Sequence, residues 1–252
     1  MTKYTDKLIG KKIAVIGGSS GIGFGAASLL LEASADITII SSSQENVTSA
    51  LSRLGGPSPN LRGLVGDVRD EAAFTQLLLS IAPLDHLVFS SVDKIIRGSL
   101  ADADLEEAKH LFGVKFWGSF VVGKALARHD IVKPGGSLTL TSGAAALRPK
   151  KGAAIGSALN AGVIASAAAL ADELSGKRVR VNTVVPGLVR TELWDKLGHS
   201  KEKQDEIFES GAKKLPVGFV ATPEDVAEAY LYLVRADYSN GATIVIDGGG
   251  SI

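Results

Sequence analysis

The sequence predicts a single α/β domain built on a doubly wound parallel sheet, with seven strands and helices on both faces. Short runs rich in β-branched residues alternate with longer helical stretches along all 252 residues, which is typical of βαβ units. Several of the runs are continuously apolar, as expected for strands that helices cover on both sides. A glycine-rich turn directly follows the first run. We therefore treat residues 1–252 as one domain.

The expected elements follow in chain order. The strand segments are Ile13–Ile16, Ile37–Ser41, Leu61–Val65, His86–Ser90, Ser137–Thr141, Arg178–Val184 and Thr243–Ile246. The predicted helices between them include Ile22–Glu32, Glu71–Ile81, Leu105–Ala127, Ala153–Leu174 and Pro223–Arg235. The last helix has the clearest start, because Thr222 can cap it, Pro223 suits its first turn and two acids follow near its positive end.

The longest segment without a strand pattern runs from residue 192 to residue 216. In a doubly wound fold it follows the sixth strand, at the carboxyl edge of the sheet where ligands bind. Two interpretations stay open, a substrate lid and a surface helical hairpin. If the segment is a lid, Trp194 is a candidate apolar wall of the substrate site.

Composition excludes several classes of function. The chain has 27 basic and 27 acidic side chains and no basic run, so neither nucleic acid nor an anionic membrane is an expected partner. The absence of cysteine excludes disulfides and thiolate chemistry, and His110, His129 and His199 lack ligand-like spacing, so no metal is expected. No segment approaches the roughly 20 apolar residues of a membrane span, and no apolar stretch precedes Ile13. We expect a cytoplasmic protein.

The strongest local signal is the segment GGSSGIG, which lies between the first strand and the first helix. Gly17 permits a tight turn, Gly21 lets the backbone approach a pyrophosphate, and Gly23 allows close packing of helix on strand. The helix N-terminus then offers unpaired N–H groups and positive potential to the phosphates. The predicted cofactor residues in this loop are Gly17, Ser19, Ser20, Gly21, Ile22 and Gly23.

From about residue 10 to residue 250 the chain resembles the short-chain dehydrogenase/reductase family. GGSSGIG is similar to the family's G-x-x-x-G-x-G loop, and further matches are Asp67-Val68, the stretches 138–142 and 181–191, and Asp247-Gly248-Gly249. The resemblance implies a Rossmann-type fold and a nicotinamide cofactor. It implies an adenine contact at Asp67 and Val68, and further cofactor contacts at Ser90, Pro186, Gly187, Val189 and Thr191.

The end of the second strand bears on which nicotinamide cofactor binds. A carboxylate at this place would chelate the ribose hydroxyls and repel a 2′-phosphate, but the chain has Ser41, Ser42 and Ser43 there. Three hydroxyls and the helix start after Ser43 can donate to that phosphate instead. The Arg that often follows in phosphate-binding relatives is missing. We predict NADP(H) over NAD(H).

The resemblance breaks at the family's proton-transfer residues, which are Asn, Ser, Tyr and Lys. Ser142 matches the Ser, but thirteen residues later stands Ile155 in place of Tyr, and four residues after that stands Leu159 in place of Lys. No Tyr occurs between Tyr4 and Tyr230. The helix Asn is replaced by Lys115.

Two replacements are candidates for the catalytic groups. Ser142 could donate a hydrogen bond to a substrate oxygen. Lys115 could reach the volume vacated by Lys at position 159 and stabilise negative charge, or act as an acid if burial lowers its pKa. A lysine that faces solvent or a subunit interface is the alternative. Charged loops at the same edge either are solvated or bind an anionic or carbonyl-rich substrate; they contain Asp93, Lys94, Arg97, Arg148, Lys150 and Lys151.

The leading hypothesis is an atypical NADP(H)-dependent reductase of specialised metabolism that acts on an activated carbonyl or iminium-type small molecule, because such acceptors tolerate the loss of Tyr. The alternatives are a non-redox cyclase or isomerase that uses the same pocket, and a nucleotide-sensing binding protein. The helix Ala153–Leu174 is rich in small residues, and the family resemblance implies that it helps to form a homodimer or homotetramer. Trp117 is expected to pack at a helix interface.

Overall fold

The computed structural model describes residues 6–95 and 98–252, and it confirms the predicted fold class. Seven parallel strands form one sheet in the order β3-β2-β1-β4-β5-β6-β7. The strands are β1 Lys12–Ile16, β2 Asp36–Ser41, β3 Leu61–Val65, β4 Leu84–Phe89, β5 Val132–Thr141, β6 Arg180–Pro186 and β7 Thr243–Ile246. Each lies at or near its predicted segment.

The start of β5 differs most from the prediction. Val132 already pairs with Leu84, and the register then shifts before His86 pairs with Ser137. The intervening Pro and two glycines favour a turn in the sequence. In the structure this segment is nevertheless part of β5, because its first residue pairs with β4. The predicted start at Ser137 is therefore late.

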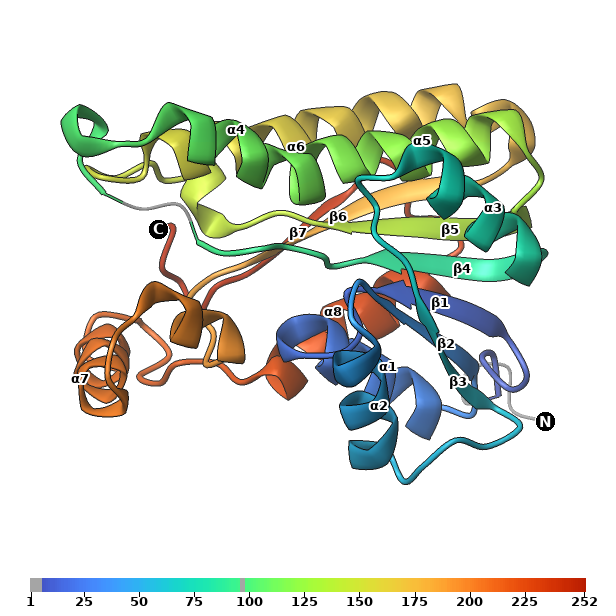
Figure 1. Cartoon of the computed structure of the whole chain (residues 1–252), viewed down its shortest axis with the longest axis horizontal. Helices are drawn as coiled ribbons and strands as arrows, with labels where there is room; N and C mark the ends of the chain where they lie inside the picture. Colours follow the sequence, from blue (N-terminus) through green and yellow to red (C-terminus); the bar gives the residue numbers. More distant parts are fainter. Residues whose placement is uncertain (1–5, 96–97) are drawn as a thin grey trace.

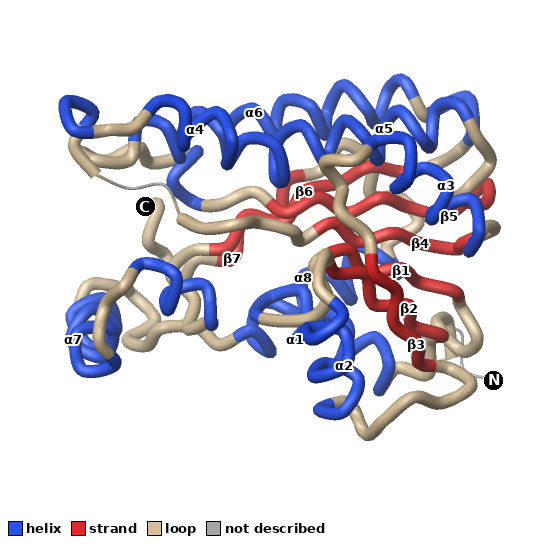
Figure 2. Tube along the Cα trace, in the orientation of Figure 1, coloured by secondary structure: helices blue, strands red, loops and turns tan. Residues whose placement is uncertain are grey.

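The strand order creates a switch point beside β1. This strand pairs in parallel with β2 on one side and with β4 on the other. The connections that leave β1 and β4 therefore run to opposite faces of the sheet (Figure 2), and the cavity described below opens where these two strands end. Ligands of doubly wound sheets bind at such a switch point.

Helices cover both faces of the sheet (Figure 1). One face carries α1 Gly21–Glu32, α2 Gln44–Arg53 and α8 Pro223–Arg235, and the other carries α3 Glu71–Ile81, α5 Gly118–Arg128 and α6 Ala154–Glu173. Two apolar cores result, one around Leu30 and Tyr230, the other around Phe74 and Val163. This double cover explains the continuously apolar strands. Three short 3-10 helices, Leu100–Asp102, Ala144–Ala146 and Ser175–Lys177, lie in the connections.

The predicted helix Leu105–Ala127 is helical over its whole length, but a π-helical turn interrupts its α-helical pattern. It consists of α4 Leu105–Phe112, a π-helical turn Gly113–Trp117, and α5. A glycine stands at each junction, and a Cβ atom at Gly118 would come within 2.8 Å of the Val68 side chain. Gly118 lets the helix backbone pack closely against Val68 and against Phe89 of the sheet. Glycine also has a weak helix propensity, and both features accompany the irregular turn.

The predicted helix starts at Thr222 and after Ser43 are confirmed. Thr222 and Asp225 form a reciprocal capping box at the start of α8, which satisfies N–H groups that the helix leaves free. Ser43 caps α2 by accepting a hydrogen bond from the N–H of Asn46.

Residues 192–216 fold into the 3-10 helix Glu192–Leu197 and the helix α7 Lys201–Ala212. In Figure 1 this part lies beyond the carboxyl ends of the strands, separate from the two helical layers. Its small core contains Trp194, Phe208 and Val220.

Helix α6 is more apolar than the sequence analysis allowed. Its 20 residues include a window of mean hydropathy 1.6, long and apolar enough by these measures to cross a membrane. In the structure α6 instead packs along β5 and β6, and Val163, Ala167 and Leu170 are buried. The same composition serves a helix in the core of a folded domain.

Candidate functional site

A cavity of about 1290 Å³ opens at the carboxyl ends of the strands, between the glycine loop, the start of α6 and residues 192–215. Fourteen of the sixteen predicted cofactor residues line it, all except Gly23 and Ser43, and both predicted catalytic residues line it as well. The lining residues from the predictions are Gly17, Ser19, Ser20, Gly21, Ile22, Ser41, Ser42, Asp67, Val68, Ser90, Lys115, Ser142, Pro186, Gly187, Val189 and Thr191.

The glycine loop has the conformation that its sequence demands. Gly17 has φ +79°, and a Cβ atom there would lie 2.7 Å from the backbone nitrogen of Ser91. A Cβ atom at Gly23 would lie 2.2 Å from the carbonyl oxygen of Gly17, so Gly23 packs helix on loop instead of lining the cavity. Ser20 precedes α1 without capping it through its side chain. The side chain of Ser20 therefore leaves the N–H groups at the start of α1 to other partners.

An anion already stands at this helix terminus. The Gly21 N–H donates to Glu192 Oε2 at 2.9 Å, and the other oxygen of this carboxylate lies 3.5 Å from an Arg53 nitrogen. The Glu192 side chain shows that a negatively charged group fits at the α1 N-terminus, where phosphate is expected. Sequence reasoning missed this contact, because 171 positions separate the two residues and no motif links them.

At the end of β2, the three serines have different surroundings. The Ser41 and Ser19 hydroxyls lie 3.0 Å apart, and Ser42 is exposed at the cavity. Ser43 does not line the cavity, because its hydroxyl caps α2. The side chain of Asn46, which the prediction did not include, lines it instead. No carboxylate stands among these residues.

Asp67 is held by a neighbour that the prediction also missed. The Arg69 guanidinium binds the Asp67 carboxylate, with a shortest distance of 2.6 Å, and lies 3.8 Å from Asp93. The hydrogen bond from Arg69 lowers the pKa of Asp67. Asp67 therefore presents an anchored carboxylate beside the buried Val68 at the predicted adenine place.

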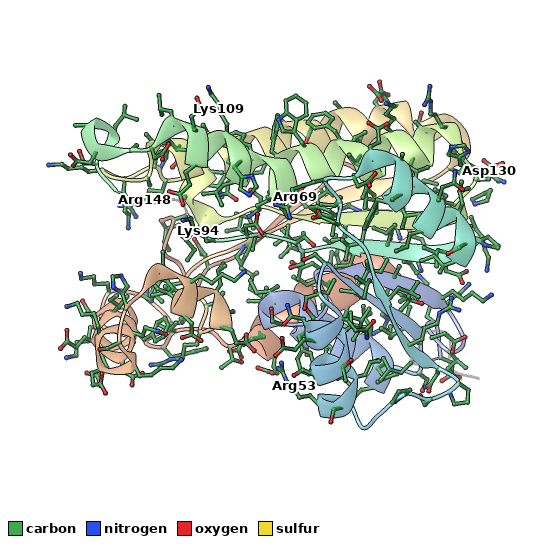
Figure 3. The ribbon with its side chains drawn as sticks, viewed as in Figure 1. Arg53, Arg69, Lys94, Lys109, Asp130 and Arg148 are labelled. Atoms are coloured by element: carbon green, nitrogen blue, oxygen red, sulfur yellow. The ribbon has the colours of Figure 1, made fainter. Side chains whose placement is uncertain are left out.

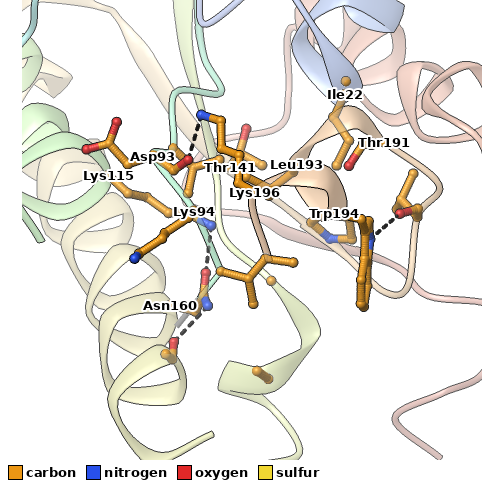
Figure 4. Close-up of a pocket in the computed structure, with 18 of the residues that line it drawn as sticks. Ile22, Asp93, Lys94, Lys115, Thr141, Asn160, Thr191, Leu193, Trp194 and Lys196 are labelled. Carbon is orange, nitrogen blue, oxygen red and sulfur yellow. Dashed lines mark hydrogen bonds between the residues drawn. The ribbon is translucent and has the colours of Figure 1, made fainter. Parts of the chain in front are cut away.

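Lys115 points into the cavity, and the solvent-facing alternative is wrong. It lies in the π-helical turn, and its Nζ donates to the Ser142 carbonyl oxygen at 2.8 Å and to Asn160 Oδ1 at 2.7 Å (Figure 4). Burial lowers the pKa of Lys115 to about 8. Among the described residues no carboxylate forms an ion pair with it, so the ammonium depends on neutral acceptors.

The hydroxyl of Ser142 is less available than expected. It donates to the backbone carbonyl oxygen of Asn160 at 2.7 Å, and a carbonyl oxygen can only accept, so the proton of Ser142 is engaged within the protein. The prediction that Ser142 donates to a substrate therefore requires that this bond break. Lys115 is the better placed donor in this structure.

The register of α6 corrects the position count made from the sequence. Ile155 does not line the cavity, and Leu159 borders it but is only 4% exposed and belongs to the apolar core. Gly156 and Asn160, also four residues apart, line the cavity one helical turn from each other. The place expected for a Tyr and a Lys is therefore held by Gly156 and Asn160, one residue later in each case.

Tyr230 reaches the end of β5 from the opposite face of the sheet. It is fully buried on α8, its hydroxyl lies 2.6 Å from Thr141 Oγ1, and Thr141 in turn donates to the Phe89 carbonyl oxygen. Tyr230 must therefore be the donor to Thr141. Burial raises the pKa of Tyr230. Its proton is bound within the core, so Tyr230 does not replace the missing acid.

The charged loops surround the open side of the cavity. Lys94 pairs with Glu107, and Arg148 Nη1 donates to the Ile252 carbonyl oxygen. Figure 3 labels Lys94 and Arg148, on the loops that follow β4 and β5. Lys150 and Lys151 line the cavity and are exposed, and Arg97 lies outside the described residues. Within residues 6–95 and 98–252, no group of three His, Asp or Glu side chains is placed to hold a metal.

Trp194 is buried beside the cavity, whereas Trp117 is exposed on the surface. Trp194 lines the cavity but is only 5% exposed; its ring packs edge-on against Phe208 and its Nε1 donates to the Val189 carbonyl oxygen. Trp117 is 60% exposed and contacts Phe116 and Phe120 on its own surface. Within a single chain, the prediction that Trp117 packs between helices is wrong.

Comparison with known proteins gives a consistent result. The family model of an SDR-like Rossmann domain matches residues 4–252. The chain is 31% identical to the short-chain dehydrogenase/reductase ucsE of an Acremonium species, over 100% of this chain and 99% of that protein. It is 33% identical to the short-chain dehydrogenase/reductase malC of Malbranchea aurantiaca, over 97% and 96%.

Solved structures agree. The structure of the MalC reductase/Diels-Alderase from Malbranchea aurantiaca superposes with a TM-score of 0.85, at 29% identity and 98% coverage of both chains. A small-chain dehydrogenase in complex with NADPH superposes with a TM-score of 0.79, at 29% identity, over 96% of this chain and 99% of the other. The chain therefore belongs to the short-chain dehydrogenase/reductase family of oxidoreductases, whose Rossmann domain binds nicotinamide cofactors.

Proposed function

We propose that the chain is an NADPH-dependent reductase of an activated carbonyl or iminium-type small molecule, with Lys115 in place of the family's usual acid. The observation that carries the proposal is that one cavity joins the N-terminus of α1, where the Gly21 N–H already binds a carboxylate, to the Lys115 amino group. The α1 N–H groups suit the phosphates of a dinucleotide, and the Glu192 carboxylate is an anion already bound there. NADPH, when bound, supplies a hydride to the substrate.

The preference for NADPH rests on the end of β2. Ser42 is exposed at the cavity and Asn46 lines it, so a hydroxyl and an amide can donate to a 2′-phosphate. The α2 N-terminus, which Ser43 caps, adds positive potential at the same place. The acid nearest in sequence, Glu45 in the first turn of α2, does not line the cavity.

The preference is tested by calorimetric titration of NADPH and NADH. The wild-type protein should bind NADPH more tightly, and Ser42→Asp should reverse or abolish the difference. Ser52→Asp is the matched control, because it adds the same charge at an exposed position of α2 outside the cavity and should leave the preference unchanged. Equal affinities in the wild-type protein would contradict the assignment.

Lys115 distinguishes between the two kinds of acceptor. A protonated Lys115 donates to a carbonyl oxygen and stabilises the negative charge that develops there. It repels an iminium ion, which already carries a positive charge and needs no proton when it accepts hydride. Because the pKa of Lys115 is about 8, turnover of a carbonyl should fall as pH rises through 8, and turnover of an iminium should not. A panel of both kinds of substrate decides between them.

A non-redox cyclisation is the second candidate. It is supported by the similarity of the chain to malC and by its superposition on the MalC reductase/Diels-Alderase, a protein named for both kinds of reaction. A cavity of about 1290 Å³ is large enough to enclose a cofactor and a folded substrate. Formation of a cyclised product without consumption of NADPH would favour this function over reduction.

Residues 192–216 are proposed as a lid over this cavity. Leu188, Trp194 and Ile207 line the cavity from that side, and the Lys196 Nζ donates to the Asp93 carbonyl oxygen at 2.7 Å, which joins the segment to the loop after β4 (Figure 4). Lid closure on a ligand should change the fluorescence of the buried Trp194. The signal is isolated by comparison with Trp117→Phe, which removes the other tryptophan.

We also propose that the chain works as a homodimer or homotetramer. Trp117 and Phe120 are exposed on the helix that carries them, and α6 exposes small residues such as Ala161 and Ala165, which allow helices to approach closely. Light scattering after size exclusion should show that Trp117→Glu dissociates the oligomer. Tyr238→Glu, at a fully exposed aromatic residue elsewhere on the surface, should not dissociate it. A wild-type monomer at micromolar concentration would contradict the proposal.

A further inference from the structure

Asn160 is the residue of the cavity that the sequence did not point to. Its side chain comes from α6, and its Oδ1 accepts the Lys115 ammonium at 2.7 Å. Its Nδ2 donates to the Gly156 carbonyl oxygen at 2.7 Å. The second bond fixes which end of the amide faces Lys115, because a carbonyl oxygen accepts only from the nitrogen. Asn160 is thus a rigid acceptor set on a regular helix.

The Lys115 ammonium uses two of its three N–H donors within the protein. An ammonium has three donors, and two of them go to Asn160 Oδ1 and to the Ser142 carbonyl oxygen. These acceptors belong to α6 and to the end of β5, which lie on the wall of the cavity. One N–H therefore remains, and Figure 4 shows the Lys115 side chain extending from its helix toward Asn160 among the cavity residues.

Two charged groups that line the cavity near Lys115 are engaged with other side chains. On the loop after β4, Asp93 lies 3.8 Å from the Arg69 guanidinium and Lys94 pairs with Glu107. From α6 and the end of β5, the residues that meet Lys115 are neutral. Among the described residues, neutral oxygens alone hold the ammonium, so the identity of residue 160 controls its environment.

We propose that Asn160 is a positioning residue that holds the Lys115 amino group against the cavity wall and leaves one N–H for an oxygen of the substrate. This inference rests on the proposed function of Lys115. Without a fixed acceptor, a lysine on a flexible four-carbon stem would adopt many rotamers, and the donor would not stay in place for the reaction.

Two substitutions at residue 160 should act on Lys115 in opposite directions. Asn160→Asp places a carboxylate beside the ammonium, which favours the charged form and raises the lysine pKa. Asn160→Leu removes the acceptor and keeps the branching of the side chain, so the charged form loses a hydrogen bond and the pKa falls. A side chain with only a packing role would change stability, but it would not move the lysine pKa up in one variant and down in the other.

The experiment is an NMR titration of protein labelled at the lysine Cε atoms, free of cofactor and substrate. The Lys115 signal is identified by its loss in Lys115→Met. We expect the midpoint to rise by about one pH unit or more in Asn160→Asp, a tenfold change in proton affinity, and to fall in Asn160→Leu. Asn60→Asp, an exposed surface control, should leave it unchanged. An unchanged midpoint in both variants, or a shift in the same direction, overturns the positioning role.

A second measurement separates this inference from the proposed function. The pH profile of NADPH-dependent turnover is recorded for the same variants, with Asn160→Ser as a variant that keeps a shorter acceptor if Asn160→Leu fails to fold. Profiles that move with the NMR midpoints support both claims. If the midpoints move and the profiles stay fixed, Asn160 positions Lys115 but Lys115 takes no part in turnover. The proposed function then fails at this residue while the positioning role stands.

Discussion

Replacing Lys115 by Met should change how the stability of the protein depends on pH. Burial lowers the pKa of Lys115 from the usual 10.5 to about 8. Below pH 8 the lysine is protonated in both the folded and the unfolded chain, and the folded protein bears the full cost of burying the charge. Between pH 8 and pH 10.5 the folded protein loses the proton while the unfolded chain keeps it. Stability should therefore rise with pH through this window.

The magnitude follows from the two pKa values. A gap of about 2.5 pH units corresponds to about 3.5 kcal/mol, at about 1.4 kcal/mol per unit. Roughly 2.5 kcal/mol of this should appear between pH 7 and pH 10. Met at position 115 cannot titrate and keeps most of the apolar stem, so the difference in free energy of unfolding between wild type and Lys115→Met isolates this one group.

The assay is urea unfolding of both proteins at several pH values between 7 and 10. The free energy of unfolding of the wild type should rise relative to that of the variant as pH rises. Lys124→Met, an exposed lysine of α5 that pairs with Glu71, serves as the control and should show no gain of this kind with pH. If the difference in free energy of unfolding between the two proteins stays constant from pH 7 to pH 10, the claim that Lys115 is buried as a cation below pH 8 is refuted.

Three further substitutions test separate parts of the site. Ser142→Ala should reduce turnover much less than the roughly 10²-fold loss expected for the lysine variant, because the serine proton is engaged within the protein; an equal loss would contradict this. Glu192→Gln should tighten NADPH binding up to about fivefold in calorimetry, because a charged competitor leaves the Gly21 N–H, and weaker binding would exclude competition at this place. Tyr230→Phe should lower the free energy of unfolding by about 1 kcal/mol, since the hydrogen bond to Thr141 is lost, and an unchanged urea midpoint would show that the bond contributes nothing.

The fold could be predicted because its signals are local. The segment Thr243–Ile246 coincides with β7 and Ile13–Ile16 lies within β1, since apolar runs bounded by turn residues mark strands directly. The glycine loop was predictable for the same reason, because its conformation demands glycine at fixed positions. The start of β5 was not, because its pairing depends on the neighbouring strand and not on its own residues.

The chemical part of the site was only half predictable. Lys115 stood out because it replaces a residue that the family resemblance identifies. Asn160 did not, because the register of α6 depends on where the preceding loop ends, and a count from Ser142 misplaces it by one residue. The contacts of Glu192 and Tyr230 join positions far apart in the chain. Such pairs follow from the packing of elements, which single-chain patterns do not specify.

Lys115 lies within the π-helical turn Gly113–Trp117, so the direction of its side chain depends on the irregular backbone hydrogen bonds of that turn. An α-helix advances each residue by about 100°, so the extra residue in this turn rotates α4 by roughly that angle relative to α5. Deletion of one codon within the turn would restore a regular helix. It would then turn either the buried face of α4, with Ala108 and Leu111, away from the sheet or the amino group of residue 115 away from the cavity. Libraries that vary this enzyme by insertion and deletion should therefore lose function at this turn far more sharply than in the exposed loops nearby.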